Sequence, residues 1–423
     1  MLTLAEALES VFLHLPVMDT EELPLRDSNG RIAAQDYTAP APVPAWASAA
    51  MDGFAVRAED VRTASTGHPV RLKVIAAVMA GSKTSRRVIP GTTARIMTGA
   101  PLPAGADSVI PLEDTAGSQD SPSAAETLIL HPGQAGQYIN SAGHQIARGE
   151  KLVTAGAVIG PGQVLLLASA GMARVKVYRR PLVAIAATGS ELAGPGRTLR
   201  EAQIHSGTIF ALAALVRRCG GAPRLLGTAR DTPAAITALL TRGARADLLV
   251  TTGGAGGGDR DLVKTILARM GELVFPQVRM QPGKATGFGL LPAAGGGREV
   301  RIPHFILSGS PPAALAGFVA LVRPALLRMA GHSDYRPQAL TACLEGELSN
   351  PAEFLRLVWV TLEDRAGSWL ARPLRRTGAG SLTGLAGAAG LALVPPQTAA
   401  LRPGDGVQVL ALDCGNLVPS PGV

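Results

Sequence analysis

Apolar positions recur along the chain with two different periods, and the change of period divides it into segments. Near the N-terminus a helical spacing predicts an amphipathic helix, with Thr3 and Glu6 as a capping box at its start. Prolines at Pro40, Pro42 and Pro44 predict an extended linker, because proline restricts the backbone of its neighbour. The apolar face of the predicted helix comprises Leu4, Leu8, Val11, Phe12 and Leu15.

Between about residues 45 and 145 the pattern consists of short apolar runs broken by glycine and proline. The runs at 72–78, 94–98 and 108–112 predict strands, so this segment is expected to be a mostly-β insertion. Residues from about 334 onward return to short β runs separated by turns. They predict a small barrel or a sandwich.

From Pro181 onward, predicted strands and helices alternate over about 150 residues. Helices are expected after Ser206, from the Thr232-Pro233 pair, after a glycine tract, and up to about Met329. This alternation predicts a doubly wound parallel α/β sheet, which binds ligands at the carboxyl ends of its strands. The predicted strands are 182–187, 224–227, 247–252, 273–280 and 305–307.

Polar residues follow the carboxyl ends of these predicted strands. Because parallel strands end at one edge of a sheet, these residues are expected to converge on one rim. Taken singly, these residues, Glu191 and Asp231 especially, are more typical of helix caps or surface charges. Their shared placement favours a binding site. The set comprises Thr188, Gly189, Ser190, Glu191, Asp231, Thr232, Gly253, Gly254, Asp259, Asp261, Pro282, Gly283, Lys284, Ser308, Gly309, Ser310 and Pro311.

The glycine tract at 253–258 opens from an apolar strand and leads into a helical pattern. This arrangement presents backbone N–H groups to an anion. Asp259 and Asp261 would repel a bare phosphate, which favours a pocket that handles a divalent cation or an oxyanion. Because the chain contains 50 glycines, a flexible turn is an alternative. A Walker loop is excluded by Val278 and Ala285, and a dinucleotide fingerprint from Gly254 is excluded by Asp259.

Length and composition limit the class of protein. A chain of 423 residues is too long for one core and predicts roughly two to four domains. Apolar residues make up 47% and charged residues 17%, which is typical of a globular protein. Glu6 and Glu9 stand where a secretory signal would carry positive charge, and no apolar run is long enough for a membrane span. We therefore expect a cytoplasmic protein that does not bind a membrane. Cys219, Cys343 and Cys414 are widely spaced and form no C-x-x-C pair, which argues against a disulfide framework or a zinc site.

The net charge of +8 comes from dispersed arginines, and aromatic content is 4%. Without a dense basic block, nucleic acid is not an expected partner. Attraction for an anionic small molecule remains open, as does a plain bias of the genome towards arginine.

Four motifs lie in order along nearly the whole chain: Met51–Val56 (M-D-G-F-A-V), Arg95–Val109 followed by Glu113, Thr188–Leu192 (T-G-S-E-L) and the glycine tract. In these motifs the chain resembles the molybdenum insertase (molybdopterin molybdenumtransferase) family, which includes the E domain of gephyrin. The resemblance implies a multidomain α/β protein with a central doubly wound molybdopterin-binding domain at 181–333. An elongated N-terminal domain would comprise 1–44 plus 146–180, with an inserted mostly-β domain at 45–145 and a C-terminal β-barrel at 334–423.

The resemblance implies a homodimeric transferase of molybdenum cofactor biosynthesis that inserts molybdate into adenylylated molybdopterin with Mg²⁺ and releases AMP. Catalytic residues would be Asp52 and Thr98 from the partner subunit's inserted domain, together with Glu191, Asp231 and Asp261. Asp231 and Asp261 would hold the Mg²⁺, so Asp261→Asn is expected to keep the fold and abolish turnover. A molybdopterin adenylyltransferase and recipient molybdoenzymes would be partners. Cofactor-binding positions would be Thr188, Gly189, Gly253, Gly254, Gly258, Lys284, Ser308 and Ser310.

The chain departs from the family motifs at several ligand-contacting positions. Gln281 stands where the family has a lysine, Gly256 where it has a serine, and Ser310 where it has an asparagine. The segment Asn140–Gln145 lacks the family's arginine and acids. A diverged, non-catalytic relative that binds a pterin cofactor or serves as a scaffold is therefore a second interpretation. The choice between molybdate and tungstate is also open.

Overall fold

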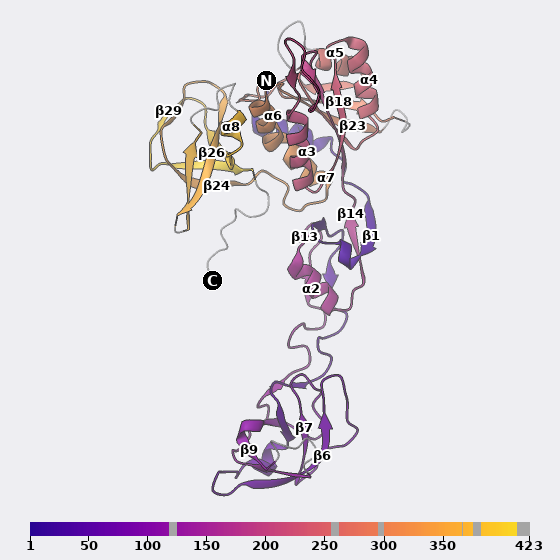
Figure 1. The fold of residues 1–423 in the computed structure, drawn as a ribbon, viewed down its shortest axis with the longest axis vertical. Helices are drawn as coiled ribbons and strands as arrows, with labels where there is room; N and C mark the ends of the chain where they lie inside the picture. Colours follow the sequence, from indigo (N-terminus) through magenta and orange to yellow (C-terminus); the bar gives the residue numbers. More distant parts are fainter. Residues whose placement is uncertain (118–124, 255–261, 295–299, 366, 375–381, 413–423) are drawn as a thin grey trace.

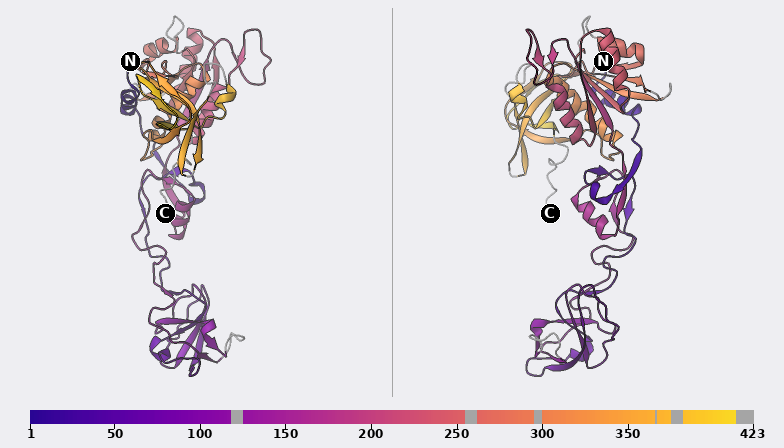
Figure 2. Two further views of the ribbon diagram at one scale, coloured as in Figure 1. Left: turned by 90° about the vertical axis from the view of Figure 1, so that its left-hand side faces the viewer. Right: turned by 45° about the vertical axis from the view of Figure 1, so that its right-hand side comes forward.

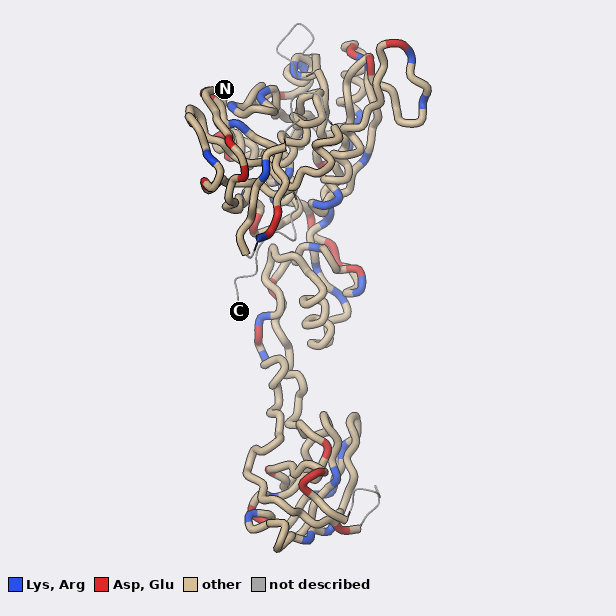
Figure 3. The backbone as a smooth tube through the Cα atoms, turned by 60° about the vertical axis from the view of Figure 1, so that its left-hand side comes forward, with Lys and Arg blue, Asp and Glu red and all other residues tan. Residues whose placement is uncertain are grey.

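An α/β body and a C-terminal barrel lie at one end of the long molecule, and an inserted β sheet lies at the other (Figure 1). This computed structural model describes residues 1–117, 125–254, 262–294, 300–365, 367–374 and 382–412. The views in Figure 2 show the same narrow connection between the two ends. Figure 3 shows basic and acidic positions interspersed along the tube.

The N-terminal helix α1 (Leu4–Leu13) forms as its sequence predicts. Its capping box is present: the Thr3 amide donates to Glu6 Oε2 at 2.8 Å, and the Glu6 amide donates to Thr3 Oγ1 at 3.3 Å. The apolar face of α1 joins the hydrophobic core of the α/β body.

The waist of the molecule pairs two distant stretches of the chain. Strands before the insertion pair antiparallel with strands after it, and α2 (Pro161–Ser169) covers them. Val43 bridges Ile146, so the proline-rich passage runs beside the returning chain. The strands are β1 (Thr20–Pro24), β2 (Arg31–Ile32), β3 (Tyr37–Thr38), β12 (Lys151–Val153), β13 (Val158–Ile159) and β14 (Arg174–Tyr178).

The insertion forms a six-stranded sheet in the order β8-β5-β7-β6-β10-β9, with apolar residues in two clusters. The prediction of a mostly-β segment is confirmed. Its strands are β5 (Gly53–Val56), β6 (Val70–Val78), β7 (Thr92–Ile96), β8 (Ser108–Pro111), β9 (Thr115–Ala116) and β10 (Glu126–Ile129); the short strands β4 (Ser48–Ala49) and β11 (Ile139–Asn140) pair beside it.

The central body is a six-stranded sheet in the order β18-β15-β19-β23-β22-β20. One apolar cluster packs one face against α1, α3, α6 and α7, and a second packs the other face against α4 and α5, so the predicted doubly wound architecture is confirmed. The elements are β15 (Leu182–Thr188), α3 (Thr208–Arg218), β18 (Ala222–Ala229), α4 (Pro233–Gly243), β19 (Leu248–Thr252), α5 (Leu262–Met270), β20 (Glu272–Phe275), β22 (Gly287–Pro292), β23 (Arg301–Leu307), α6 (Pro311–Gly317), a π-helical turn (Phe318–Val322) and α7 (Arg323–Met329).

Two sequence expectations for this sheet were wrong. The sheet is mixed, because β22 runs antiparallel to both of its neighbours, and this strand was not predicted. The strand expected at 273–280 is divided: β20 stays in the central sheet, whereas β21 (Met280–Gln281) pairs with the C-terminal sheet through β26.

The C-terminal strands close into a barrel, which decides between the barrel and the sandwich left open by the sequence pattern. Strand β26 pairs with both β27 and β28, and β24 and β30 complete the ring. The bounds are β24 (Ala339–Leu344), β26 (Leu355–Arg365), β27 (Ser368–Pro373), β28 (Gly390–Val394) and β30 (Gly406–Ala411), with β25 (Leu348–Asn350), β29 (Thr398–Leu401) and α8 (Leu382–Leu385) outside it.

The helical stretch Pro311–Met329 is long and apolar enough to meet the length and composition criteria for a membrane span. It is mostly buried in the α/β body. Its apolar residues therefore belong to the hydrophobic core of the α/β body.

Candidate functional site

The carboxyl ends of β15, β19 and β23 meet at one edge of the central sheet. Ala187 is in register with Thr252, and Thr252 is in register with Leu307. The segments that follow these strands, beginning with Thr188, Gly253 and Ser308, therefore lie side by side. The predicted rim is present.

Gly253 closes this edge by close backbone contact. A methyl group at this position would lie 2.2 Å from the Thr188 carbonyl oxygen, and its φ of 93° favours glycine. Its amide donates to the Leu307 carbonyl at 3.2 Å, and Thr252 Oγ1 donates to the Ser308 carbonyl at 2.7 Å. The Gly253 amide is therefore already used within the protein, and the expected place of Gly253 among the cofactor-binding residues stays a prediction.

The hydroxyl of Thr188 is a buried polar group at this edge. Oγ1 is buried and has no hydrogen-bond partner among the residues that the structure describes. A methyl group on Gly254 would lie 3.0 Å from it. Because a buried hydroxyl without a partner is costly, a ligand atom that bonds to it would be favoured.

Ser190 and Asp231 join the loops after β15 and β18 through reciprocal hydrogen bonds. The Ser190 amide donates to Asp231 Oδ2 at 3.1 Å, and the Asp231 amide donates to Ser190 Oγ at 3.2 Å. Glu191 folds back towards the rim, because a methyl group on Gly189 would lie 2.7 Å from Glu191 Oε1. Thr232 then caps α4 by accepting the Ala235 amide at 3.3 Å, as predicted.

A cavity of about 670 Å³ lies over these loops. Its walls bring together Glu191 and Asp231, as the sequence predicted, with a loop that the sequence analysis did not single out. That loop joins β15 to α3 and is long for an α/β connection. Its length was the feature of the sequence that could have indicated a functional loop. The lining residues are Ser190, Glu191, Arg200, Glu201, Ala202, Gln203, Asp231 and Leu262.

Several predicted residues lie outside the described part of the chain. They are Gly258, Asp259 and Asp261, and their expected places on the rim stay predictions. The described residues on either side lie at the site: Gly254 approaches the Thr188 hydroxyl, and Leu262 lines the cavity.

Ser308 and Ser310 lie at the rim, whereas Lys284 does not line the cavity beside Asp231. The carbonyl of Ser310 accepts the Ala313 and Ala314 amides at the start of α6, and its side chain makes no cap bond. Lys284 Nζ lies 5.0 Å from the centroid of the Phe354 ring, at the junction with the barrel. The expected convergence of Lys284 with the acids is therefore not seen in this chain.

Asp52 and Thr98 form a close pair at one edge of the inserted sheet. The amide and the hydroxyl of Thr98 each donate to Asp52 Oδ1 at 2.7 Å. These bonds, the backbone one foremost, hold the pKa of Asp52 below its ordinary value. Figure 1 shows the inserted sheet at the opposite end of the molecule from the α/β body, so one chain does not bring this pair to Glu191 and Asp231.

The described acids fit a hydrated magnesium ion better than a dedicated metal cage. No group of at least three His, Cys, Asp or Glu side chains is arranged to hold a metal within the described ranges. Asp231 and Glu191 nevertheless supply hard carboxylate oxygens to one cavity. Mg²⁺ is commonly held by one or two carboxylates together with waters and substrate phosphates, so this donor set is compatible with it.

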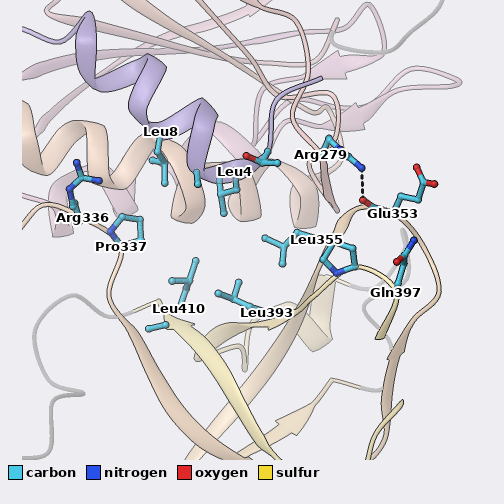
Figure 4. A pocket seen from close by; sticks show the side chains of 14 residues that line it. Leu4, Leu8, Arg279, Arg336, Pro337, Glu353, Leu355, Leu393, Gln397 and Leu410 are labelled. Carbon is cyan, nitrogen blue, oxygen red and sulfur yellow. Dashed lines mark hydrogen bonds between the residues drawn. The ribbon is translucent and has the colours of Figure 1, made fainter. Parts of the chain in front are cut away.

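A larger cavity of about 840 Å³ lies between α1 and the barrel (Figure 4). Leu4, Leu355 and Leu393 make its walls largely apolar. Its two arginines have partners within the protein: Arg279 Nη2 donates to the Glu353 carbonyl at 3.1 Å, and Arg336 pairs with Glu9. The acids of the rim are not among its lining residues, so the smaller cavity is the better candidate for the chemistry.

A doubly wound sheet with polar residues gathered at its carboxyl edge places the chain in the class of α/β proteins that bind ligands where their strands end. Family models match three regions in order: the MoeA N-terminal region (domain I and II) at 2–171, a probable molybdopterin binding domain at 184–328, and the MoeA C-terminal region (domain IV) at 341–412. The chain belongs to the molybdopterin molybdenumtransferase (MoeA) family.

Individual relatives agree with this assignment along most of the chain. Molybdopterin molybdenumtransferase 2 of Mycobacterium tuberculosis (strain ATCC 25618 / H37Rv) is 34% identical over 92% of this chain and 94% of its own. Molybdopterin molybdenumtransferase of Bacillus subtilis (strain 168) is 33% identical over 93% and 90%, respectively. The crystal structure of the molybdopterin biosynthesis MoeA protein from Pyrococcus horikosii matches with a TM-score of 0.84 at 34% identity, covering 97% of this chain and 99% of that one.

Proposed function

We propose that this protein is a transferase of molybdenum cofactor biosynthesis that inserts molybdate into adenylylated molybdopterin and releases AMP. The observation that carries the proposal is the cavity that joins Glu191 and Asp231 to the carboxyl edge of the sheet, in a chain of this family. The buried Thr188 hydroxyl at the same edge supplies a donor for a substrate oxygen.

The residues of the cavity have distinct roles in this proposal. Asp231, fixed by its reciprocal bonds to Ser190, and Glu191 would hold Mg²⁺, with Asp261 completing the set as the motif implies. When bound, Mg²⁺ neutralises charge on the phosphates of the substrate. Ser308 and Ser310 present polar groups from the neighbouring strand end, where the pterin would lie.

The site is proposed to be completed in a homodimer. The Asp52–Thr98 pair lies on the inserted sheet, so a second subunit has to bring it to the cavity (Figure 1). Exposed leucines on α2 offer apolar surface for such an assembly, with Leu165 67% and Leu166 37% exposed. The dimer would work in the cytoplasm, supplied by a molybdopterin adenylyltransferase and delivering cofactor to recipient molybdoenzymes.

A turnover assay tests the reaction. Purified protein is incubated with adenylylated molybdopterin, molybdate and Mg²⁺, and the readouts are AMP release and the activation of a cofactor-free molybdoenzyme. Asp231→Asn is expected to lower the rate about 100-fold or more, because it removes a preorganised charge. Glu347→Gln, which removes an exposed carboxylate on the barrel, is the matched control and should leave the rate unchanged.

Two other results would contradict the proposal. Pterin binding without AMP release would favour the interpretation as a non-catalytic relative. That interpretation rests on replaced motif residues such as Gln281. If Asp231→Asn turns over at the wild-type rate, the reaction does not take place in this cavity. Replacing molybdate by tungstate in the same assay decides which anion is used.

A further inference from the structure

The cavity at the carboxyl edge contains a cationic side chain that the family motifs did not assign. Among the described residues that line it, Arg200 is the sole cation, and it shares the cavity wall with the acids Glu191, Glu201 and Asp231. An anionic substrate approaching these carboxylates meets repulsion unless positive charge lies beside them. Arg200 supplies such charge from the protein itself.

Arg200 is carried by a loop with an ordered fold of its own. After β15 the chain forms β16 (Leu192–Ala193), extends outwards, and returns as β17 (Ile204–His205), which pairs with β16. A ring nitrogen of His205, Nε2, lies 3.0 Å from the Arg197 carbonyl oxygen and ties the two sides of the loop together. Figure 2 shows this loop projecting from the α/β body.

The turn that bears Arg200 is held by two hydrogen bonds to Gln203. The Gln203 amide donates to the Arg200 carbonyl at 3.1 Å, and the Arg200 amide donates to Gln203 Oε1 at 3.0 Å. Ala202, between them, has a φ of 62°, the left-handed conformation that such a tight turn requires. The backbone of Arg200 is thus positioned before any ligand binds, which lowers the entropy lost on binding.

We propose that Arg200 binds the phosphate of the adenylylated substrate, an inference that rests on the proposed function. The guanidinium presents N–H donors in a planar fork that matches two oxygens of one phosphate. Arg200 takes part in none of the ion pairs seen between described residues, so no described carboxylate competes with the substrate for the fork. Arg200 is here a binding residue that sets specificity for a nucleotide phosphate over a neutral nucleoside.

Calorimetric titration of the purified full-length protein with AMP tests this role, with adenosine as the phosphate-free probe. Arg200→Gln is expected to weaken AMP binding by about tenfold and to leave adenosine binding unchanged. Arg200→Lys keeps the charge without the fork and should fall between the two. The matched control is Arg197→Gln, which removes an exposed arginine from the same loop but not from the cavity wall.

The possible outcomes separate this inference from the proposed reaction. Equal AMP affinities for wild type, Arg200→Gln and Arg197→Gln would overturn the role of Arg200, even if wild-type turnover is normal. Equal losses in the two variants would also overturn it, because the effect would then be general charge on the loop. Arg200-dependent AMP binding in a protein that releases no AMP in the turnover assay would keep the binding role and overturn the reaction.

Discussion

Gly53, within the M-D-G-F-A-V motif, is required by the packing of one strand on another. A methyl group at this position would lie 2.0 Å from the Ile110 carbonyl oxygen on the neighbouring strand β8. Gly53→Ala is therefore expected to destabilise the inserted sheet by about 3 kcal/mol through overpacking. Gly67→Ala is the control, since nothing lies within 4 Å of a methyl group there, and it should change stability by less than about 0.5 kcal/mol. Thermal unfolding of both variants, together with limited proteolysis of the insertion, measures the loss of stability. Equal melting temperatures for the two variants would contradict the close packing of Gly53 on β8.

The Asp52–Thr98 pair makes a second prediction, for a titration. Because the bonds from Thr98 lower the pKa of Asp52 below its ordinary 3.8, the ionised carboxylate stabilises the fold above that pH. This contribution is lost as the pH falls through the lowered pKa. Thr98→Val removes the hydroxyl bond and keeps the amide bond, so the pKa should rise part of the way towards 3.8. Carboxyl-carbon NMR measures both titrations, and identical curves would show that the hydroxyl contributes nothing.

At the scale of elements, local signals predicted the parts of the structure that local chemistry determines. The capping box of α1 and the Thr232-Pro233 start of α4 involve neighbouring residues, and both form as expected. Strand β21 was misassigned because its partner is β26, more than seventy residues later in the chain, and no local pattern encodes that pairing. The rim was predictable from parallel strand order, whereas the place of Arg200 depends on tertiary contacts of its loop.

Strands β19 and β23 are joined by a buried pair whose stability depends on pH. Thr251 Oγ1 lies 2.9 Å from His304 Nε2, and burial lowers the pKa of His304 to about 3 from its ordinary 6.5. Below pH 6.5 the unfolded chain binds a proton that the folded chain excludes, so stability falls as the pH decreases from 6.5 towards 3. The loss from this residue is about 2 kcal/mol at pH 5.

A double variant isolates this effect. Thr251→Val with His304→Leu replaces both partners by apolar groups, which leaves no polar atom of the pair buried alone. Hydrogen exchange of the β19 and β23 amides at pH 7 and pH 5 should show a smaller loss of protection in the double variant than in wild type. Parallel losses in the two proteins would assign the pH dependence to other groups.

At the scale of the whole molecule, the length of the chain separates two halves of one proposed site. The waist holds the inserted sheet away from the α/β body, so a monomer has Asp52 at one end and Asp231 at the other (Figure 1). A closed dimer with two-fold symmetry can bring the end of one subunit to the body of the other, and it then forms two equivalent sites. The elongated shape is, in this proposal, the device that makes activity depend on dimerisation.

Complementation between two inactive variants tests this arrangement directly. Asp52→Asn and Asp231→Asn are each expected to be inactive, since each damages both sites of its own dimer. When the two chains are co-expressed, half of the dimers are mixed, and each mixed dimer regains one intact site, which gives roughly a quarter of wild-type activity. Co-expression of two differently tagged copies of Asp52→Asn is the control and should stay inactive. If the mixed pair releases no more AMP than its parents while forming dimers of normal size, each chain must build its site alone. The Asp52–Thr98 pair would then have to serve the inserted sheet only.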